Sequence, residues 1–286
     1  ASSRRVFDFC ATGEHGVSQR VLVVGPARSG TTQIMRALAS PDGESETIEM
    51  SFGHKIFHDA LETVREVERE PRFARYLADR DASFNHLFWS PVFALASSVE
   101  GSTVVKDPAL AKHLGIIVET RPQDVVIVTT FRDPRHCCLS YIRTLVRQQW
   151  ALPDAVDRAV TEVWPAVLEV VEVLRRFGWE RASVSGVVDA EKRWCHIAYE
   201  DWQRDIDAVG AMLGDHLAQE VTLAGLSPPS RDVVPLAFRG AESSGEVSLV
   251  DFEVSEASRY YELAKGLVEE VAWRFSQVAA DAGYDT

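Results

Sequence analysis

The sequence predicts an α/β fold in which helices flank a central, mostly parallel sheet. Short apolar runs, the pattern of buried parallel strands, occur at residues 21–24, 103–106, 124–131 and 193–199. Between them lie segments whose apolar residues recur at helical spacing, such as 55–70. Strands that alternate with helices favour parallel pairing, with helices on both faces of the sheet. Because ligands of such sheets bind at the carboxyl ends of the strands, we expect the functional site there.

The composition is that of a globular protein. Of the 286 residues, 46% are hydrophobic and 26% are charged, which is enough to bury a sizeable core. We expect a single domain over residues 1–286, with an N-terminal arm at 1–19, an irregular loop at 228–247 and a closing helix at 255–282. A net charge of −13 argues against a general nucleic-acid-binding protein, although it permits a local basic pocket.

Cysteine usage and hydropathy predict a cytoplasmic protein. The cysteines form no CxxC pair, so neither a zinc site nor a disulfide framework is suggested and a reducing compartment fits best; they are Cys10, Cys137, Cys138 and Cys195. No apolar run is long enough to span a bilayer, and the first residues lack the apolar stretch of a signal peptide. The high content of Ala, Val, Arg and Asp suggests a bacterial protein from a GC-rich genome.

The chain is organised around residues 20–39, RVLVVGPARSGTTQIMRALA. A predicted strand, a glycine-bounded loop and a helix N-terminus succeed one another there. They form an anion cradle, because free backbone N–H groups and the positive end of the helix dipole point at one place. The loop has Walker A spacing, but Thr31 stands where a lysine would contact the β- and γ-phosphates. Arg28 supplies the positive charge instead, which favours an anion other than a triphosphate.

The segments after the cradle are expected to pass its mouth and then build core. Residues 47–54 are predicted as a short strand, and 55–70 as an amphipathic helix. The aromatic-rich stretch 84–99 could line an acceptor pocket, but core packing is the favoured interpretation. Further along, residues 178–192 are polar and are predicted as a loop.

A second anion site is indicated by Arg132 and Ser140. Arg132 comes directly after the strand predicted at 124–131, and Ser140 lies eight positions later, in the first turns of the next helix. Arginine can make a bidentate charged contact with a phosphate, and serine a short neutral one. Arg135 either adds charge or is simply exposed. Two anion sites on one sheet suit a nucleotide phosphorylated at both its 3′ and 5′ positions, and fit neither ATP nor NAD well.

These motifs resemble those of sulfotransferases that use 3′-phosphoadenosine 5′-phosphosulfate (PAPS). The run P-x-R-S-G-T-T resembles their 5′-phosphosulfate loop, closest to the tyrosylprotein and bacterial branches, and FRDPR with Ser140 resembles their 3′-phosphate element. VVKDP at 104–108, AYEDW at 198–202 and, more distantly, FRG at 238–240 are similar to further stretches of the family. The resemblance covers roughly residues 21–50 and 103–215, and it implies a P-loop-NTPase-like sulfotransferase fold.

The resemblance also implies an activity and a set of ligands. It implies metal-independent, in-line transfer of a sulfuryl group from PAPS to a hydroxyl, less often an amine, of a small-molecule acceptor, with 3′-phosphoadenosine 5′-phosphate (PAP) as the product. Arg28 and Lys106 are implied to act in catalysis, with Lys106 neutralising the bridging oxygen as the leaving phosphate departs. The residues implied to bind the donor are Arg28, Ser29, Gly30, Thr31, Thr32, Arg132, Ser140, Tyr199 and Arg239.

The branches of the family place the general base differently. The cytosolic branch has a histidine shortly after the lysine, but here Asp107 and Pro108 come after Lys106. The tyrosylprotein branch uses a glutamate about twenty residues after the loop arginine, which favours Glu49, then His54, then Glu46. A buried carboxylate or a histidine can each accept a hydroxyl proton near neutral pH. The remaining histidines on predicted helices, His58 and His113, are expected to be structural.

Two other functions stay open on the sequence alone. A P-loop kinase or nucleotide hydrolase would bind ATP with Mg²⁺, but the missing Walker lysine argues against it. A non-catalytic module would bind PAPS or PAP without turnover, and substitution of Glu49 or His54 would then have no effect on any activity.

Overall fold

The computed structural model describes residues 20–38, 53–70, 84–100, 104–189, 194–217, 273 and 275–284. Within these residues a five-stranded sheet has the order β2-β1-β3-β5-β4. The strands are β1 (Arg20–Val24), β2 (Val104–Lys106), β3 (Val125–Phe131), β4 (Gly186–Asp189) and β5 (Trp194–Ala198). Strands β2, β1, β3 and β5 pair in parallel, whereas β4 joins the edge of the sheet antiparallel to β5. The predicted α/β class with a mostly parallel sheet is confirmed.

The position of β4 corrects one prediction. Residues 178–192 were expected to form a loop, yet Val187 pairs with Cys195 of β5. Every residue of β4 is half-buried, so the strand lacks the buried apolar run that marks the other strands. Its conformation is fixed by backbone pairing at the edge of the sheet, which leaves little trace in the side-chain pattern.

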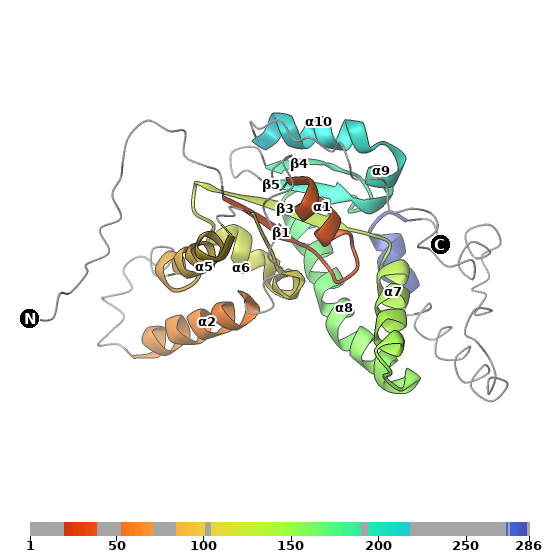
Figure 1. Ribbon diagram of the computed structural model, residues 1–286, viewed down its shortest axis with the longest axis horizontal. Helices are drawn as coiled ribbons and strands as arrows, with labels where there is room; N and C mark the ends of the chain where they lie inside the picture. Colours follow the sequence, from red (N-terminus) through yellow and green to blue (C-terminus); the bar gives the residue numbers. More distant parts are fainter. Residues whose placement is uncertain are drawn as a thin grey trace, which may run out of the picture.

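Helices cover both faces of the sheet (Figure 1). One face packs against α1 (Thr31–Leu38), α9 (Tyr199–Arg204) and α10 (Ile206–Leu217). The other packs against α2 (Gly53–Arg69), α5 (Ser90–Glu100), α6 (Leu114–Glu119), α7 (Pro134–Arg147), α8 (Leu152–Arg176) and the helical residues 275–281. Alternation along β3 separates the two cores, since Val125 and Ile127 face one side and Val126 and Val128 face the other.

Two short non-α helices complete the described elements. A π-helical turn, η1 (Asn85–Trp89), leads directly into α5, and a 3₁₀ helix, η2 (Pro108–His113), leads into α6. Phe84, Phe88, Trp89 and Phe93 are all buried in the core beside α2. Phe88 meets Phe57 edge to face at 5.3 Å. The aromatic stretch therefore packs in the core, as the favoured interpretation predicted.

The strand predicted at 47–54 is wrong for its last two residues, which are helical. His54 lies in the first turn of α2, and residues 47–52 fall outside the described part of the chain. The domain limits predicted at 1–19 and 228–247 also fall outside it, and 275–281 is the described helical part of the predicted closing helix. Among the residues described, no helix has the length and apolar character needed to cross a bilayer.

Candidate active site

The loop between β1 and α1 turns through two residues with a left-handed backbone. Arg28 has φ = 70° and Gly30 has φ = 98°, both in the left-handed region. The Gly30 carbonyl accepts hydrogen bonds from the N–H groups of Gln33 (2.9 Å) and Ile34 (3.1 Å), which starts α1. A helix leaves its first N–H groups without intrahelical partners, so this loop presents donors at the carboxyl end of β1.

A buried hydroxyl pair fastens the loop to the central strand β3. Ser29 is 1% exposed, and its Oγ lies 2.6 Å from Oγ1 of Thr130. Gly25 passes so close to the same residue that a Cβ there would lie 2.3 Å from the Thr130 carbonyl oxygen. Contacts with the side chain and the backbone of Thr130 thus fix the position of the loop relative to the sheet.

Lys106 brings a positive charge to the first turn of α1. It is the last residue of β2, 2% exposed, and its ammonium donates a 2.8 Å hydrogen bond to Oγ1 of Thr32. A buried ammonium is costly unless it is hydrogen-bonded or paired. Lys106 and Thr32 are 74 positions apart in the sequence, and the structure brings them into contact, as expected for two residues assigned to one site.

Arg132 and Tyr199 lie together at the same edge of the sheet. Each comes directly after a strand, β3 and β5, and the Arg132 guanidinium lies 4.4 Å from the centre of the Tyr199 ring. The Nε atom of Arg132 is buried and has no hydrogen-bond partner among the described residues. The Tyr199 ring also lies against the loop, because a Cβ on Gly30 would be 2.7 Å from it. Burial raises the pKa of the Tyr199 phenol.

The cradle and the second predicted anion site are in direct contact. Nε of Arg28 donates a 3.1 Å hydrogen bond to Oγ of Ser140 on α7. Arg28, Lys106, Arg132 and Tyr199 thus all lie at the carboxyl ends of parallel strands, as predicted. Arg135, whose role was left open, forms a bidentate pair with Asp133, with its shortest contact at 2.6 Å.

His54 lies at the same edge, beside Asp107. Its backbone N–H donates to Oδ2 of Asp107 (2.9 Å), and its ring Nδ1 is 4.0 Å from that oxygen. Asp107 is 2% exposed and also caps η2 through the Ala109 N–H (2.9 Å). Burial raises the pKa of its carboxyl group. Gly53 permits this approach, because a Cβ there would lie 2.6 Å from Oδ2.

Three of the residues named from sequence lie outside the described part of the chain: Glu46, Glu49 and Arg239. The two histidines expected to be structural, His58 and His113, meet edge to face at 4.9 Å beside Phe57. Burial lowers the pKa of His113 to about 4, so its ring is neutral at pH 7.

Sequence reasoning missed several residues that support the site. Thr130 was passed over as part of a strand, although a hydroxyl at the carboxyl end of a buried run is a detectable signal. Asp107 was treated only as part of a motif, and its contact with His54 was not foreseen. Glu200 and Tyr284 meet at 2.9 Å across 84 positions, and no sequence pattern indicates that pair.

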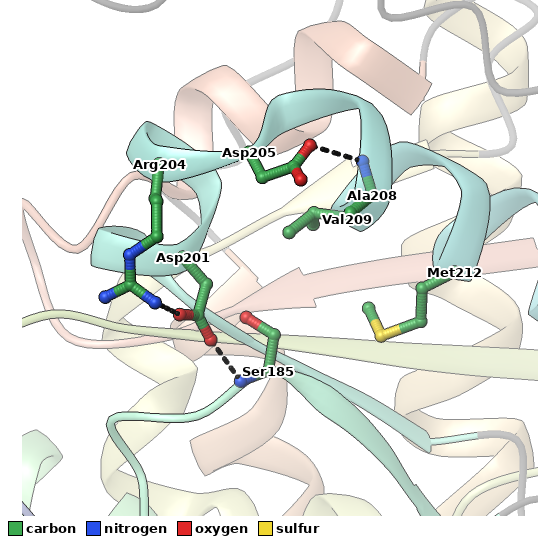
Figure 2. A pocket seen from close by; sticks show the side chains of 7 residues that line it. All are labelled: Ser185, Asp201, Arg204, Asp205, Ala208, Val209 and Met212. Carbon is green, nitrogen blue, oxygen red and sulfur yellow. Dashed lines mark hydrogen bonds and ion pairs between the residues drawn. The ribbon is translucent and has the colours of Figure 1, made fainter.

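A separate hollow of about 330 Å³ lies between the start of β4 and the helices α9 and α10 (Figure 2). Its acidic side chains are already engaged. Asp201 accepts hydrogen bonds from the Ser185 N–H (2.8 Å) and from Arg204 (3.2 Å), and Asp205 caps α10 through the Ala208 N–H (2.9 Å). None of the predicted site residues lines it. We therefore place the candidate active site at the strand ends, where the cationic side chains converge.

This geometry is that of an α/β protein with a glycine-containing loop and a helix N-terminus after its first described strand. The family to which it belongs is given by sequence: residues 20–222 match the Sulfotransferase family. The chain belongs to that family, and membership supports a sulfotransferase activity. No curated protein sequence matches the chain significantly.

Solved structures similar to this chain are bacterial sulfotransferases. The sulfotransferase domain of the Synechococcus PCC 7002 olefin synthase is 14% identical, with 93% of this chain and 95% of that chain covered and a TM-score of 0.48. A sulfotransferase from Alicyclobacillus acidocaldarius is 15% identical, with 94% and 97% covered and a TM-score of 0.42. Sulfotransferase STF9 from Mycobacterium avium is 14% identical, with 73% and 66% covered and a TM-score of 0.42.

Proposed function

We propose that this protein transfers a sulfuryl group from PAPS to a hydroxyl group of a small-molecule acceptor. The observation that carries the proposal is the Arg28–Ser140 hydrogen bond of 3.1 Å, which places the loop assigned to the 5′-phosphosulfate against the element assigned to the 3′-phosphate. A donor with phosphate at both positions would contact both elements at once. An amine acceptor is the less favoured alternative.

The residues present fit the 5′ end of such a donor. Residues 28–32 would hold the 5′-phosphate and the sulfuryl group through backbone N–H groups and the hydroxyls of Thr31 and Thr32. The conformation of Gly30 supports this fit. Its φ of 98° and its contact with Tyr199 leave no room for a side chain, so the backbone itself forms this part of the cradle.

The residues also fit the 3′ end. Arg132 would bind the 3′-phosphate together with Ser140, and its buried, unpartnered Nε atom is the kind of donor that a phosphate oxygen satisfies. Arg28 could reach either anion, since its guanidinium already touches Ser140. Tyr199, whose ring lies against the Arg132 guanidinium, would contact the nucleotide beside it. Arg239, which lies outside the described residues, is proposed to bind the donor as well.

When bound, PAPS supplies an activated sulfuryl group on a phosphate oxygen. Transfer breaks the bond from sulfur to that bridging oxygen and forms a bond from sulfur to the acceptor oxygen, while the acceptor proton moves to a base. Lys106 keeps its ammonium at Thr32, in the first turn of α1. From there it can offset the negative charge that grows on the leaving phosphate, as Arg28 can on the sulfuryl oxygens.

For the base we propose Glu49 or His54. His54 has the better-defined position, because its backbone N–H donates to Asp107 and its ring Nδ1 lies 4.0 Å from the same carboxylate oxygen. Replacing His54 with Asn and Glu49 with Gln separates the two in single-turnover sulfation of 2-naphthol. The variant that loses most of its rate, without loss of PAP affinity, identifies the base.

The test of the function is a thermal-shift titration with PAP, beside ATP with Mg²⁺ and AMP. A ligand that binds the folded state raises the melting temperature by mass action. We expect a rise with PAP that is lost in Arg132→Ala. A rise with ATP and Mg²⁺ alone would contradict the proposal and favour a P-loop kinase or hydrolase. PAP binding without transfer to any acceptor would favour a non-catalytic PAPS-binding module.

A further inference from the structure

Arg132 lies among carboxylates and yet pairs with none of those that the structure describes. Its guanidinium rests on the Tyr199 ring, and its buried Nε atom has no hydrogen-bond partner there. Asp133 is the next residue in the chain, and Glu200 comes directly after Tyr199. The buried Cys137 thiol lies 3.8 Å from the Arg132 carbonyl oxygen, and the Asp133 N–H donates to Glu200, so the three groups share one neighbourhood.

Each of these carboxylates is bound by another partner. Asp133 accepts from the guanidinium of Arg135 at 2.6 and 3.0 Å, and it caps α7 through the Arg135 N–H at 2.9 Å. Glu200 accepts from the Asp133 N–H through Oε1 (3.2 Å) and from the Tyr284 hydroxyl through Oε2 (2.9 Å). Both oxygens of each carboxylate thus already accept hydrogen bonds from groups other than Arg132.

Tyr284 is held firmly enough to act as a fixed donor. Its ring stacks on Phe131, the residue before Arg132, with centroids 6.2 Å apart. Its backbone N–H donates to the Ala279 carbonyl (3.0 Å), and the neighbouring Gly283 carbonyl accepts from the Ser183 hydroxyl (3.0 Å). Burial, with the adjacent Glu200 charge, raises the pKa of the Tyr284 phenol, which therefore keeps its proton. Figure 1 shows this segment in blue, near the C-terminus of the chain.

We infer that Glu200 and Tyr284 are positioning residues that keep the Arg132 guanidinium available for a 3′-phosphate, and so help set the specificity for bisphosphorylated nucleotides. The inference rests on the proposed function. The Tyr284 hydroxyl satisfies Glu200, and Glu200 holds the backbone of the Arg132–Asp133 turn without taking the arginine as its partner. Loss of that hydroxyl would leave Oε2 without its donor in a part-buried place, where it could attract the Arg132 guanidinium.

The experiment measures PAP and AMP affinities by titration calorimetry for the parent protein, Tyr284→Phe, Glu200→Gln and the double variant. AMP carries the 5′-phosphate but lacks the 3′-phosphate. We expect Tyr284→Phe to weaken PAP binding roughly tenfold, the scale of one hydrogen bond to a charged group, and AMP binding by less than about twofold. In the double variant the neutral amide cannot compete for Arg132, so PAP affinity should recover to within about threefold of the parent value.

Tyr141→Phe is the matched control, because it removes a hydroxyl from another partly buried tyrosine that packs against the core. It should leave both affinities unchanged. If Tyr284→Phe does not fold, the affinity of Glu200→Gln is the test. The inference requires that Glu200→Gln binds PAP at least as tightly as the parent protein does, and weaker binding would overturn it. Unchanged PAP affinity in Tyr284→Phe, equal losses for both ligands, or a further loss in the double variant would overturn the inference and leave the proposed function standing. A parent protein that binds no PAP would overturn both.

Discussion

At the scale of single residues, the site depends on two glycines that allow another side chain to approach the backbone closely. Gly30 lets the backbone of the cradle pass over the Tyr199 ring, and Gly53 lets α2 begin against the Asp107 carboxylate. In each case a Cβ would lie well inside van der Waals contact, at 2.7 and 2.6 Å. The absence of a side chain at Gly30 and Gly53 therefore allows Tyr199 and Asp107 to take their places in the site.

Gly30→Ala tests this requirement. A side chain at φ = 98° is strained, and here it would also collide with the ring that supports Arg132. We expect a loss of about 1–3 kcal/mol in the free energy of unfolding, measured by urea denaturation, and at least a tenfold loss of PAP affinity.

Gly178→Ala is the control for backbone strain alone. Gly178 also has a positive φ, 78°, but a Cβ there would meet no atom within 4 Å. It should cost about 1 kcal/mol and leave PAP affinity unchanged. Normal PAP binding in Gly30→Ala would show that the close contact with Tyr199 is not needed for the cradle.

At the scale of elements, the site is a meeting of strand ends whose loops are fastened to one another. Thr130 of β3 holds the cradle through Ser29, and Asp107 joins the start of α2 to the start of η2. The cationic side chains thus lie at or just after the ends of buried parallel strands, which support a site more rigidly than long loops do.

Thr130→Val is expected to loosen the cradle while it preserves the shape of the strand. The Ser29 hydroxyl would be buried without its partner at 2.6 Å, at a cost of about 1–3 kcal/mol in the free energy of unfolding. Adding Ser29→Ala removes both polar groups, so the double variant should be more stable than Thr130→Val alone. Urea denaturation of Thr130→Val, Ser29→Ala and the double variant measures this, and additive losses would mean that the two hydroxyls do not depend on each other.

At the scale of the whole molecule, the features predicted correctly from the sequence are those that local patterns determine. The parallel strands and the ends where Arg28, Lys106, Arg132 and Tyr199 lie were predicted, because buried strands form continuous apolar runs and the topology places their ends together. The edge strand β4 has no such pattern. Contacts such as Glu200 with Tyr284 depend on how distant segments pack, which periodicity does not encode.

The structure also predicts how the stability of the whole molecule depends on pH. His196 is fully buried in β5; its Nε2–H donates to the Ala182 carbonyl (2.8 Å), and Nδ1 lies 2.9 Å from the Thr129 hydroxyl. Burial lowers its pKa to about 4, from 6.5 in the unfolded chain. The unfolded state therefore takes up a proton at a higher pH than the folded state. Stability is complete above pH 6.5 and is lost as the pH falls from 6.5 towards 4.

We expect protonation of His196 alone to lower the free energy of unfolding by about 2 kcal/mol when the pH falls from 7 to 5. His113 adds to this fall over the same pH range, because its pKa is also lowered to about 4. Urea denaturation at both pH values measures the change. His196→Asn removes the titrating group and should make the fall shallower, whatever its own cost in stability, whereas His86→Gln, at an exposed position, should leave the fall unchanged. A fall as steep in His196→Asn as in the parent would show that His196 accepts its proton equally well in the folded and unfolded states.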